Sequence, residues 1–293
     1  MIPLPSLPAA HALVARSDLP IPAWLFAWAA SGVLIVSFFA LSLAWRKPRL
    51  EDERWRSRGA WIWRVAVSIP VQVLLGAVGV GLLGVAVYAG LRGTDAPDRN
   101  LALTFFFVTV WLGFPALSVV LGDVFRPFNP WRALGRVAGA CAGSVGVRDI
   151  VRRHYPERLG RWPAAVGLVA FVWLEVVYGA GGVTGAGLSP HTVAVAALLY
   201  SGYTLAMMGI FGVDTWCSRG EVFSVYFGMF SQLGVFEARE GVLGTRRPLA
   251  AATLWASVPG SLAVVVASIG TTSFDGAQEG GSRGDLEEAV VAP

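Results

Sequence analysis

Residues 23–44 read AWLFAWAASGVLIVSFFALSLA, an unbroken apolar run with Trp24 and Trp28 near one end and Trp45 and Arg46 beyond the other. A helix of about 20 apolar residues spans the hydrocarbon core of a bilayer and satisfies its own backbone hydrogen bonds there. Tryptophan followed by basic residues is typical of the interfacial anchors of such a helix. This stretch therefore predicts a membrane-spanning helix.

Five further apolar stretches predict spans over residues 65–91, 101–121, 163–178, 192–213 and 249–269. Glycines in the second span are expected to let a neighbouring helix approach closely: Gly76, Gly79, Gly81 and Gly84. Pro115 is expected to bend the third span, because proline removes one helical hydrogen bond, and Pro259 with Gly260 interrupts the sixth. The predicted fold class is all-α, a polytopic membrane protein with six transmembrane helices.

The basic residues fall on alternate sides of these spans. Of 23 Lys and Arg residues, all but Arg16, Arg92, Arg99 and Arg283 follow the first, third or fifth span. Short loops rich in basic residues stay in the cytoplasm. The prediction is an extracytoplasmic N-terminal segment (1–22), a membrane domain (23–269) and an extracytoplasmic polar tail (270–293).

Two cytoplasmic loops contain further apolar segments. Asn129 is a good N-cap, Pro130 suits the first helical position, and apolar residues then recur at helical spacing, which predicts a helix on the cytoplasmic membrane surface. Residues 221–236, EVFSVYFGMFSQLGVF, would form a helix that is apolar on nearly every face. Sixteen residues are short for a membrane span, which favours a re-entrant or interfacial helix. A seventh span is the alternative and would place the C-terminus in the cytoplasm.

Composition agrees with a membrane location. The chain is 55% hydrophobic and only 14% charged, with a mean hydropathy of +0.60, whereas soluble domains average about 25% charged residues. The lipid bilayer is the predicted partner, and an oligomer is left open. The net charge of +4 comes from arginines beside the spans, so nucleic-acid binding is not predicted. Cys141 and Cys217 both fall in cytoplasmic loops, so a disulfide is not expected.

Several strings together resemble a family of bacterial multi-pass membrane proteins commonly labelled fenitrothion hydrolase. They are HALVARSDLPIPAWLFAWAA from His11, DVFRPFNPWRALGR from Asp123, YPERLGRWPAAVGL from Tyr155, EVFSVYFGMFSQL from Glu221 and IGTTSFDGAQEG from Ile269. The resemblance implies the cytoplasmic membrane of a bacterium and, through the label, hydrolysis of organophosphate triesters. Family members continue with further spans after the FDG string, so the resemblance also implies that this chain is truncated.

Glu175 is the one carboxylate well inside a predicted span, with Tyr178 three residues further on the same face. An ionisable group in a membrane needs a partner or a water-filled cavity, which makes Glu175 a candidate for a catalytic, substrate-binding or proton-carrying role. A structural hydrogen bond to another helix is the alternative.

A second candidate site lies on the predicted extracytoplasmic side. His11, Asp18, His191, Asp275 and Glu279 offer imidazole and carboxylate ligands suited to a divalent metal such as zinc or copper. The string LPAAHA resembles the end of a signal peptide, and cleavage after Ala10 would give His11 a free amine. Asp275 is the candidate metal ligand or general base, because Gly276 permits a tight turn. Ordinary loop residues that never meet are the alternative.

The sequence leaves three functions open, and whether the chain is an enzyme is undecided. The resemblance favours a hydrolase, but hydrolysis of a phosphotriester needs an activated water or a strong nucleophile, and the sequence indicates neither. Breaks at Pro115 and Pro259 and the carboxylate of Glu175 favour a transporter or permease component. A scaffold without its own chemistry is the third reading.

Overall fold

The computed structural model describes residues 23–44, 55–57, 61–66, 68–96, 99–144, 153–178, 188–239 and 242–279. The chain divides into two compact units, Met1–Asp52 and Glu53–Pro293. The first contains helix α1 (Ala23–Ala44), whose bounds are those predicted from its apolar run. At 22 residues, α1 is about 33 Å long.

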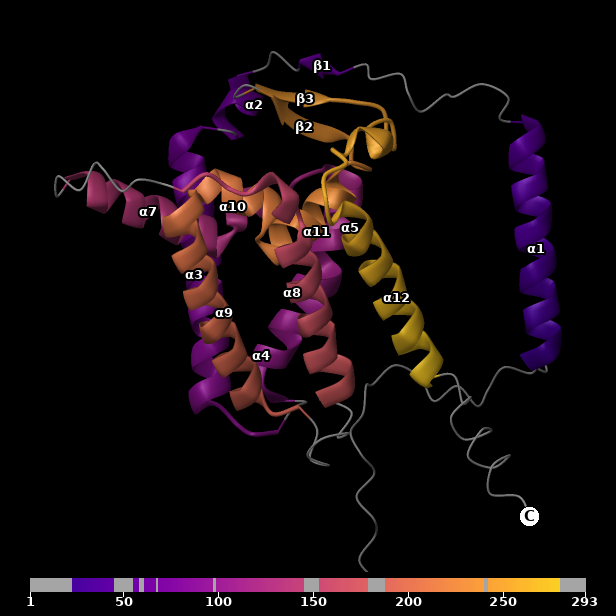
Figure 1. Ribbon diagram of the computed structural model, residues 1–293, viewed down its shortest axis with the longest axis horizontal. Helices are drawn as coiled ribbons and strands as arrows, with labels where there is room; N and C mark the ends of the chain where they lie inside the picture. The colour runs from indigo at the N-terminus through magenta and orange to yellow at the C-terminus, as the bar shows by residue number, and fades with distance from the viewer. Residues whose placement is uncertain are drawn as a thin grey trace, which may run out of the picture. The chain divides into compact units, whose positions relative to one another are not determined.

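Long helices form the second unit and alternate in direction between its two ends (Figure 1). Helix α3 (Ile69–Arg92) packs against α9 (Pro190–Phe211), and α8 (Trp162–Val172) packs against α12 (Ser261–Glu279). Helix α4 (Leu101–Leu103) continues through a π-helical segment, Thr104–Gly113, into α5 (Phe114–Leu121). A second π-helical segment, Trp173–Tyr178, extends α8. The described part of the chain is therefore mostly helical.

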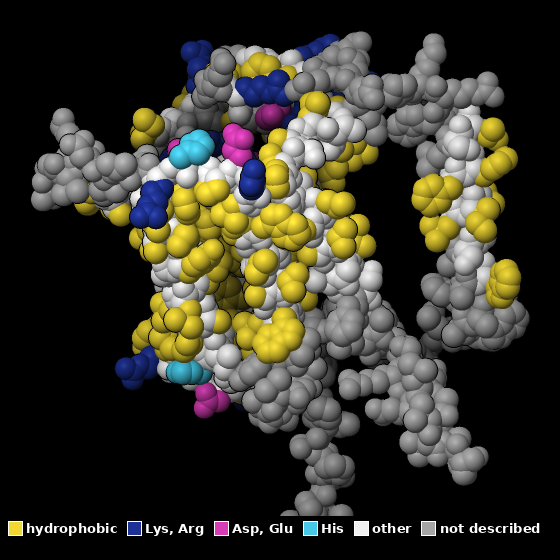
Figure 2. Space-filling view, in the orientation of Figure 1, with side chains coloured by type: hydrophobic (Ala, Val, Ile, Leu, Met, Phe, Trp, Pro, Cys, Tyr) yellow, Lys and Arg dark blue, Asp and Glu magenta, His cyan; other side chains and the backbone are white. Residues whose placement is uncertain are grey.

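Among the residues that the structure describes with their side chains, three helices are long and apolar enough to cross a membrane: Ile69–Arg92, Leu101–Leu121 and Pro190–Phe211. They carry many exposed apolar side chains, such as Ile69 at 77% and Leu199 at 71% exposure, and Figure 2 shows such side chains along the long helices. Exposed apolar area of this extent indicates a membrane protein. The π-helical segment ends at Gly113, two residues before Pro115, and the bend expected at Pro115 stays a prediction.

The predicted span over 249–269 is wrong at its start, although the expected interruption at Pro259 and Gly260 is present. Residues 249–260 form turns and a 3-10 helix (Ala252–Leu254), and α12 begins only at Ser261. Pro259 has no N–H to continue a helix, and Gly260 has φ = 81°, in the left-handed region that favours glycine. A side chain at Gly260 would also clash with the backbone at Trp162.

Short elements gather at the upper end in Figure 1, which we call the arginine-rich end. They are α2 (Trp61–Ala66), α6 (Phe125–Phe128), α7 (Pro130–Ser144), α10 (Val213–Arg219) and α11 (Val222–Ser231). The described arginines in the elements and loops of this end are Arg56, Arg64, Arg126, Arg132, Arg136, Arg153, Arg158, Arg161, Arg219, Arg239, Arg246 and Arg247, whereas Arg92 and Arg99 lie between α3 and α4 at the opposite end (Figure 1). The charge asymmetry of the sequence is therefore an asymmetry between the two ends of the helices.

Both helices predicted between the spans are present. Asn129 caps α7 as expected, since its Oδ1 accepts the N–H of Arg132 at 2.9 Å. Helix α11 is shorter than the predicted 221–236 and largely buried. Its 10 residues rise about 15 Å, half the thickness of the hydrocarbon core, so α11 is too short for a seventh span.

A small antiparallel sheet was not predicted and corrects the all-α assignment. Its strand order is β1 (Arg56–Ser57), β3 (Val242–Thr245), β2 (Phe236–Arg239), with Phe236 opposite Thr245 and Arg239 opposite Val242. The strands have at most four residues, too few to reveal the alternation that identifies a strand in a sequence.

The core lies where α5, α8 and α9 meet α10 and α11. Trp216 and Phe227 are almost completely buried there, and Trp111 stacks on Tyr226 with ring centroids 4.9 Å apart. Close helix approach was expected at four glycines of α3 and occurs at two. A Cβ at Gly79 would collide with the Phe128 carbonyl and one at Gly76 would lie 2.9 Å from the Ala133 Cβ, whereas Gly81 and Gly84 face open space.

Candidate functional site

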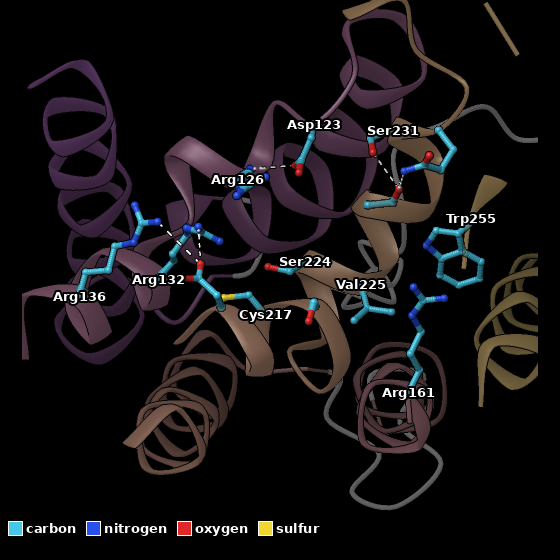
Figure 3. A pocket seen from close by; sticks show the side chains of 14 residues that line it. Asp123, Arg126, Arg132, Arg136, Arg161, Cys217, Ser224, Val225, Ser231 and Trp255 are labelled. Carbon is cyan, nitrogen blue, oxygen red and sulfur yellow. Dashed lines mark hydrogen bonds and ion pairs between the residues drawn. The ribbon is translucent and has the colours of Figure 1, made fainter. Parts of the chain in front are cut away.

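A cavity of about 450 Å³ opens among the short elements of the arginine-rich end (Figure 3). Helices α6, α7, α10 and α11 contribute to its wall, together with residues that precede α6, α8 and α12. Its lining is mostly polar: Asp123, Arg126, Arg132, Arg136, Arg161, Asp214, Cys217, Ser218, Ser224, Val225, Gly228, Ser231, Gln232 and Trp255. Four arginines against two aspartates give this cavity a formal excess of two positive charges.

Arg161 is fixed at the start of α8 by the turn that precedes α12. Its N–H donates to the Pro259 carbonyl at 2.7 Å, and its Nη1 donates to the Ala256 carbonyl at 2.7 Å and to Ser261 Oγ at 2.9 Å. Its Cζ lies 3.8 Å from the centroid of the Trp255 ring, a cation–π distance. The guanidinium is therefore held rigidly beside the cavity.

The charge of Arg161 is not balanced by a carboxylate. The residue is only 8% exposed, its Nε has no hydrogen-bond partner, and no carboxylate among the described residues lies within ion-pair distance. Burial, and secondly the positive charge of Arg219, lower its pKa to about 10. Arg161 is therefore still a cation at neutral pH, in a place where an unpaired charge is costly.

Two other arginines of the wall share one carboxylate. Nη2 of Arg132 lies 2.6 Å from Asp214 Oδ1, and Nη2 of Arg136 lies 3.7 Å from the same oxygen. The Arg132 side chain is 9% exposed, whereas Asp214 is 73% exposed. Burial, followed by the charges of Arg126 and Arg136, lowers the pKa of Arg132. Asp214 thus compensates only part of the local charge.

Arg126 adds a fourth guanidinium. Asp123 precedes the short helix α6, and its Oδ1 accepts the backbone N–H of Arg126 at 3.1 Å. The Arg126 guanidinium itself has no carboxylate within ion-pair distance among the residues that the structure describes. Two of the four arginines in the wall, Arg126 and Arg161, therefore have no carboxylate partner among the described residues.

A buried network supports the wall from behind. Glu221 is completely buried and caps α11: its Oε1 accepts from Tyr200 Oη at 2.6 Å and from Phe223 N at 3.0 Å, and its Oε2 accepts from Asn129 Nδ2 and Ser224 N. Asn129 Nδ2 also donates to Ser224 Oγ at 2.8 Å. Asn129 and Glu221 therefore join the starts of α7 and α11 and fix the cavity residues that follow.

The cavity offers binding groups rather than an activated nucleophile. Cys217 is 5% exposed, and burial, with the negative charge of Glu221 second, raises the pKa of its thiol to about 12. The thiol is therefore protonated at neutral pH and a poor nucleophile. Ser218, Ser224 and Ser231 line the wall, but no histidine is among the described lining residues to serve as their base.

The structure locates two of the predicted site residues with their side chains. Glu175 is half-buried in the π-helical end of α8, where it makes a contact, and His191 is exposed in the first turn of α9. Asp275 and Glu279 lie in α12, where the structure describes the backbone but not these two side chains. His11 and Asp18 lie outside the described residues. No metal-binding group of three His, Cys, Asp or Glu occurs in the described part. The metal site stays a prediction.

The turn expected after Asp275 is wrong, because α12 continues as a helix through Gly276 to Glu279. Sequence reasoning also missed Arg161 and Glu221. A carboxylate directly before the apolar run of α11 is an N-cap signal that could have drawn attention to Glu221. Nothing local distinguishes Arg161 from the other arginines of its loop.

Comparison with known proteins leaves the chain without an assigned relative. No protein-family model, curated protein or solved structure matches it. The site must therefore be interpreted from its own geometry.

Proposed function

We propose that this chain is an integral membrane protein that binds a small organic oxyanion in its arginine-lined cavity, as a transporter or permease component. One observation carries the proposal: Arg161 lines the cavity as a buried cation without a carboxylate partner among the described residues. A buried guanidinium is stabilised by a partner that accepts charge-assisted hydrogen bonds, and a bound oxyanion supplies that partner.

The proposal includes the membrane topology expected from the sequence. Helices α1, α8 with its π-helical extension, and α12 join the three long apolar helices as six spans of a bacterial cytoplasmic membrane. The arginine-rich end then faces the cytoplasm, α7 lies on the cytoplasmic membrane surface, α11 is re-entrant and both termini are extracytoplasmic. The gathering of arginines at one end of the helices supports this orientation.

Binding and transport suit the cavity better than the triester hydrolysis implied by the family resemblance. A phosphotriester is neutral, whereas the wall carries excess positive charge. The thiol of Cys217, with its pKa near 12, is also a poor nucleophile. Two of the long helices contain π-helical segments, a helix type that often occurs at functional sites.

Calorimetric titration of phenyl phosphate into the purified protein in lipid nanodiscs tests binding. Arg161→Gln should weaken the affinity by roughly 10- to 100-fold, the loss expected for a hydrogen bond to a charged group. Arg161→Lys, which keeps the charge, should weaken it less. Arg92→Gln, at an exposed position of the opposite end, is the matched control and should bind as the unchanged protein does.

Flux measurements separate a transporter from a binding protein. Liposomes containing the protein should accumulate labelled phenyl phosphate, and Arg161→Gln liposomes should not. Absence of binding by the unchanged protein would overturn the proposal and favour a scaffold. Binding without flux would keep the anion site and remove the transporter assignment.

A further inference from the structure

We propose that the cavity is selective for a dianionic phosphate monoester over monoanionic diesters. This inference rests on the proposed function, because it names the chemical class of the anion bound at that same site. Charge balance, the placement of the cationic groups and the size of the cavity support it.

Charge balance gives the expected charge of the ligand. The wall contains Arg126, Arg132, Arg136 and Arg161 against Asp123 and Asp214, which leaves two positive charges. Behind the wall, the positive charge of Arg219 acts on Arg161 and the negative charge of Glu221 acts on Cys217, so these two charges offset each other. A dianion neutralises the two excess charges of the wall, whereas a monoanion leaves one of them uncompensated in a partly buried site.

The cationic groups surround the cavity. Figure 3 shows Arg126, Arg132 and Arg136 on one side and Arg161 on the other, with the cavity between them. A phosphate monoester has three terminal oxygens and accepts hydrogen bonds from guanidinium groups in several directions at once. A phosphodiester has two such oxygens and a lower charge, so it satisfies fewer of these donors.

The cavity has room for the organic part of the ester. Its volume of about 450 Å³ falls within the range of small-molecule sites, roughly 300 to 1,000 Å³. Val225 and Trp255 contribute apolar surface beside the guanidinium groups. The site therefore accepts more than inorganic phosphate.

A matched pair of probes tests the charge selectivity. At pH 8 phenyl phosphate is a dianion, because the second pKa of a phosphate monoester is about 6, whereas methyl phenyl phosphate is a monoanion of similar shape. The monoester should bind about tenfold more tightly than the diester. Equal affinities for the two probes would overturn the inference while leaving the anion-binding function intact. Failure of both probes to bind would instead overturn the proposed function.

Two variants change the charge of the wall in opposite directions. Arg126→Gln removes one positive charge, and Asp214→Asn removes one negative charge. By Coulomb's law, the logarithm of the monoester affinity should change about twice as much as that of the diester, downward for Arg126→Gln and upward for Asp214→Asn. Equal changes for both probes would contradict the inference. Arg126→Gln alone decides it if Asp214→Asn, which leaves Arg132 with less compensation, fails to fold.

A phosphate monoester could belong to a lipid headgroup or to a soluble metabolite. Nanodiscs that contain phosphatidic acid, a monoester lipid, are compared with nanodiscs that contain phosphatidylglycerol, a diester. Inhibition of phenyl phosphate binding by phosphatidic acid, reduced by Arg126→Gln, identifies a lipid ligand. Unaltered binding in both nanodiscs identifies a soluble monoester. Inhibition by the diester lipid equal to that by phosphatidic acid overturns the monoester class.

Discussion

The two ends of the helix bundle differ in whether their charged side chains are buried or exposed. At the arginine-rich end, Glu221, Asn129 and Arg161 are buried, and every oxygen of Glu221 accepts hydrogen bonds from fixed partners. At the opposite end, Asn100 is buried but uncharged, and the charged side chains of Arg92 and Asp95 are exposed. The contrast teaches that a charged group in water needs no partner from the protein, whereas a buried one requires a specific environment and points to a site.

The largest expected effect tests which end faces the cytoplasm, and it is all-or-none. In a background of Cys141→Ser and Cys217→Ser, a membrane-impermeant maleimide added to intact cells should label Asp95→Cys and should not label Arg158→Cys. Both positions are exposed, at opposite ends of the helices. After the cells are broken, both should react, which serves as the control. The reverse pattern in intact cells would invert the topology.

The second test compares the two cysteines. The pKa of about 12 at Cys217 lies above the ordinary thiol value, so its thiolate fraction at pH 8 is lower by roughly three powers of ten. Exposed Cys141 should therefore be alkylated first by iodoacetamide, as followed by mass spectrometry of the folded protein. Because the pKa is raised, the rate at Cys217 should increase about tenfold per pH unit above pH 8. Comparable rates at pH 8 would contradict the burial of Cys217.

Removal of the Glu221 carboxylate should destabilise the arginine-rich end. Glu221→Ala leaves Tyr200, Asn129 and two backbone N–H groups without their acceptor, a loss of about 3 kcal/mol in the free energy of unfolding. Glu157→Ala, at an exposed position of the same end, should change stability by less than about 0.5 kcal/mol. Equal melting temperatures of the two variants in detergent would remove the supporting role of the network.

The smallest effect concerns helix α3, which runs between both ends. Gly79→Ala places a methyl group against the Phe128 carbonyl and should destabilise the protein by about 2 kcal/mol. Gly81→Ala meets open space and should stabilise it by up to about 1 kcal/mol, because alanine is the better helix former. Thermal unfolding of both variants checks the opposite signs. If both variants destabilise the protein equally, the close approach of α6 is not the reason for glycine at position 79.

The sequence predicted the helices better than their surroundings. Apolar runs located α1 and the helix over 101–121 at the observed bounds, because a helix in lipid must be apolar along its whole length. The run 249–258 is equally apolar, yet it forms turns, because Arg161 binds the carbonyls of Ala256 and Pro259 there. These contacts join residues about 100 positions apart, and no local pattern contains them.

The candidate site was less predictable than the fold. Arg161 belongs to a loop that contains several other arginines, and its guanidinium packs on Trp255 from a distant segment. From the sequence, Glu221 was only the first residue of a predicted apolar helix. Its partners Asn129 and Tyr200 come from distant parts of the chain, so the sequence did not reveal them. Glu175 and His191 drew attention through their chemistry, but their roles stay predictions.

The Asn129 side chain also has a consequence for biosynthesis. Its partners Glu221 and Ser224 lie 92 and 95 residues later in the chain. During translation, the cap that Asn129 Oδ1 gives to α7 can form at once, whereas the two bonds of its Nδ2 must wait for a long loop to close. Until α11 has been synthesised, the amide group of Asn129 has no Glu221 or Ser224 to accept its hydrogen bonds. We therefore expect the unfinished chain to be more sensitive to proteases before α11 is complete than after.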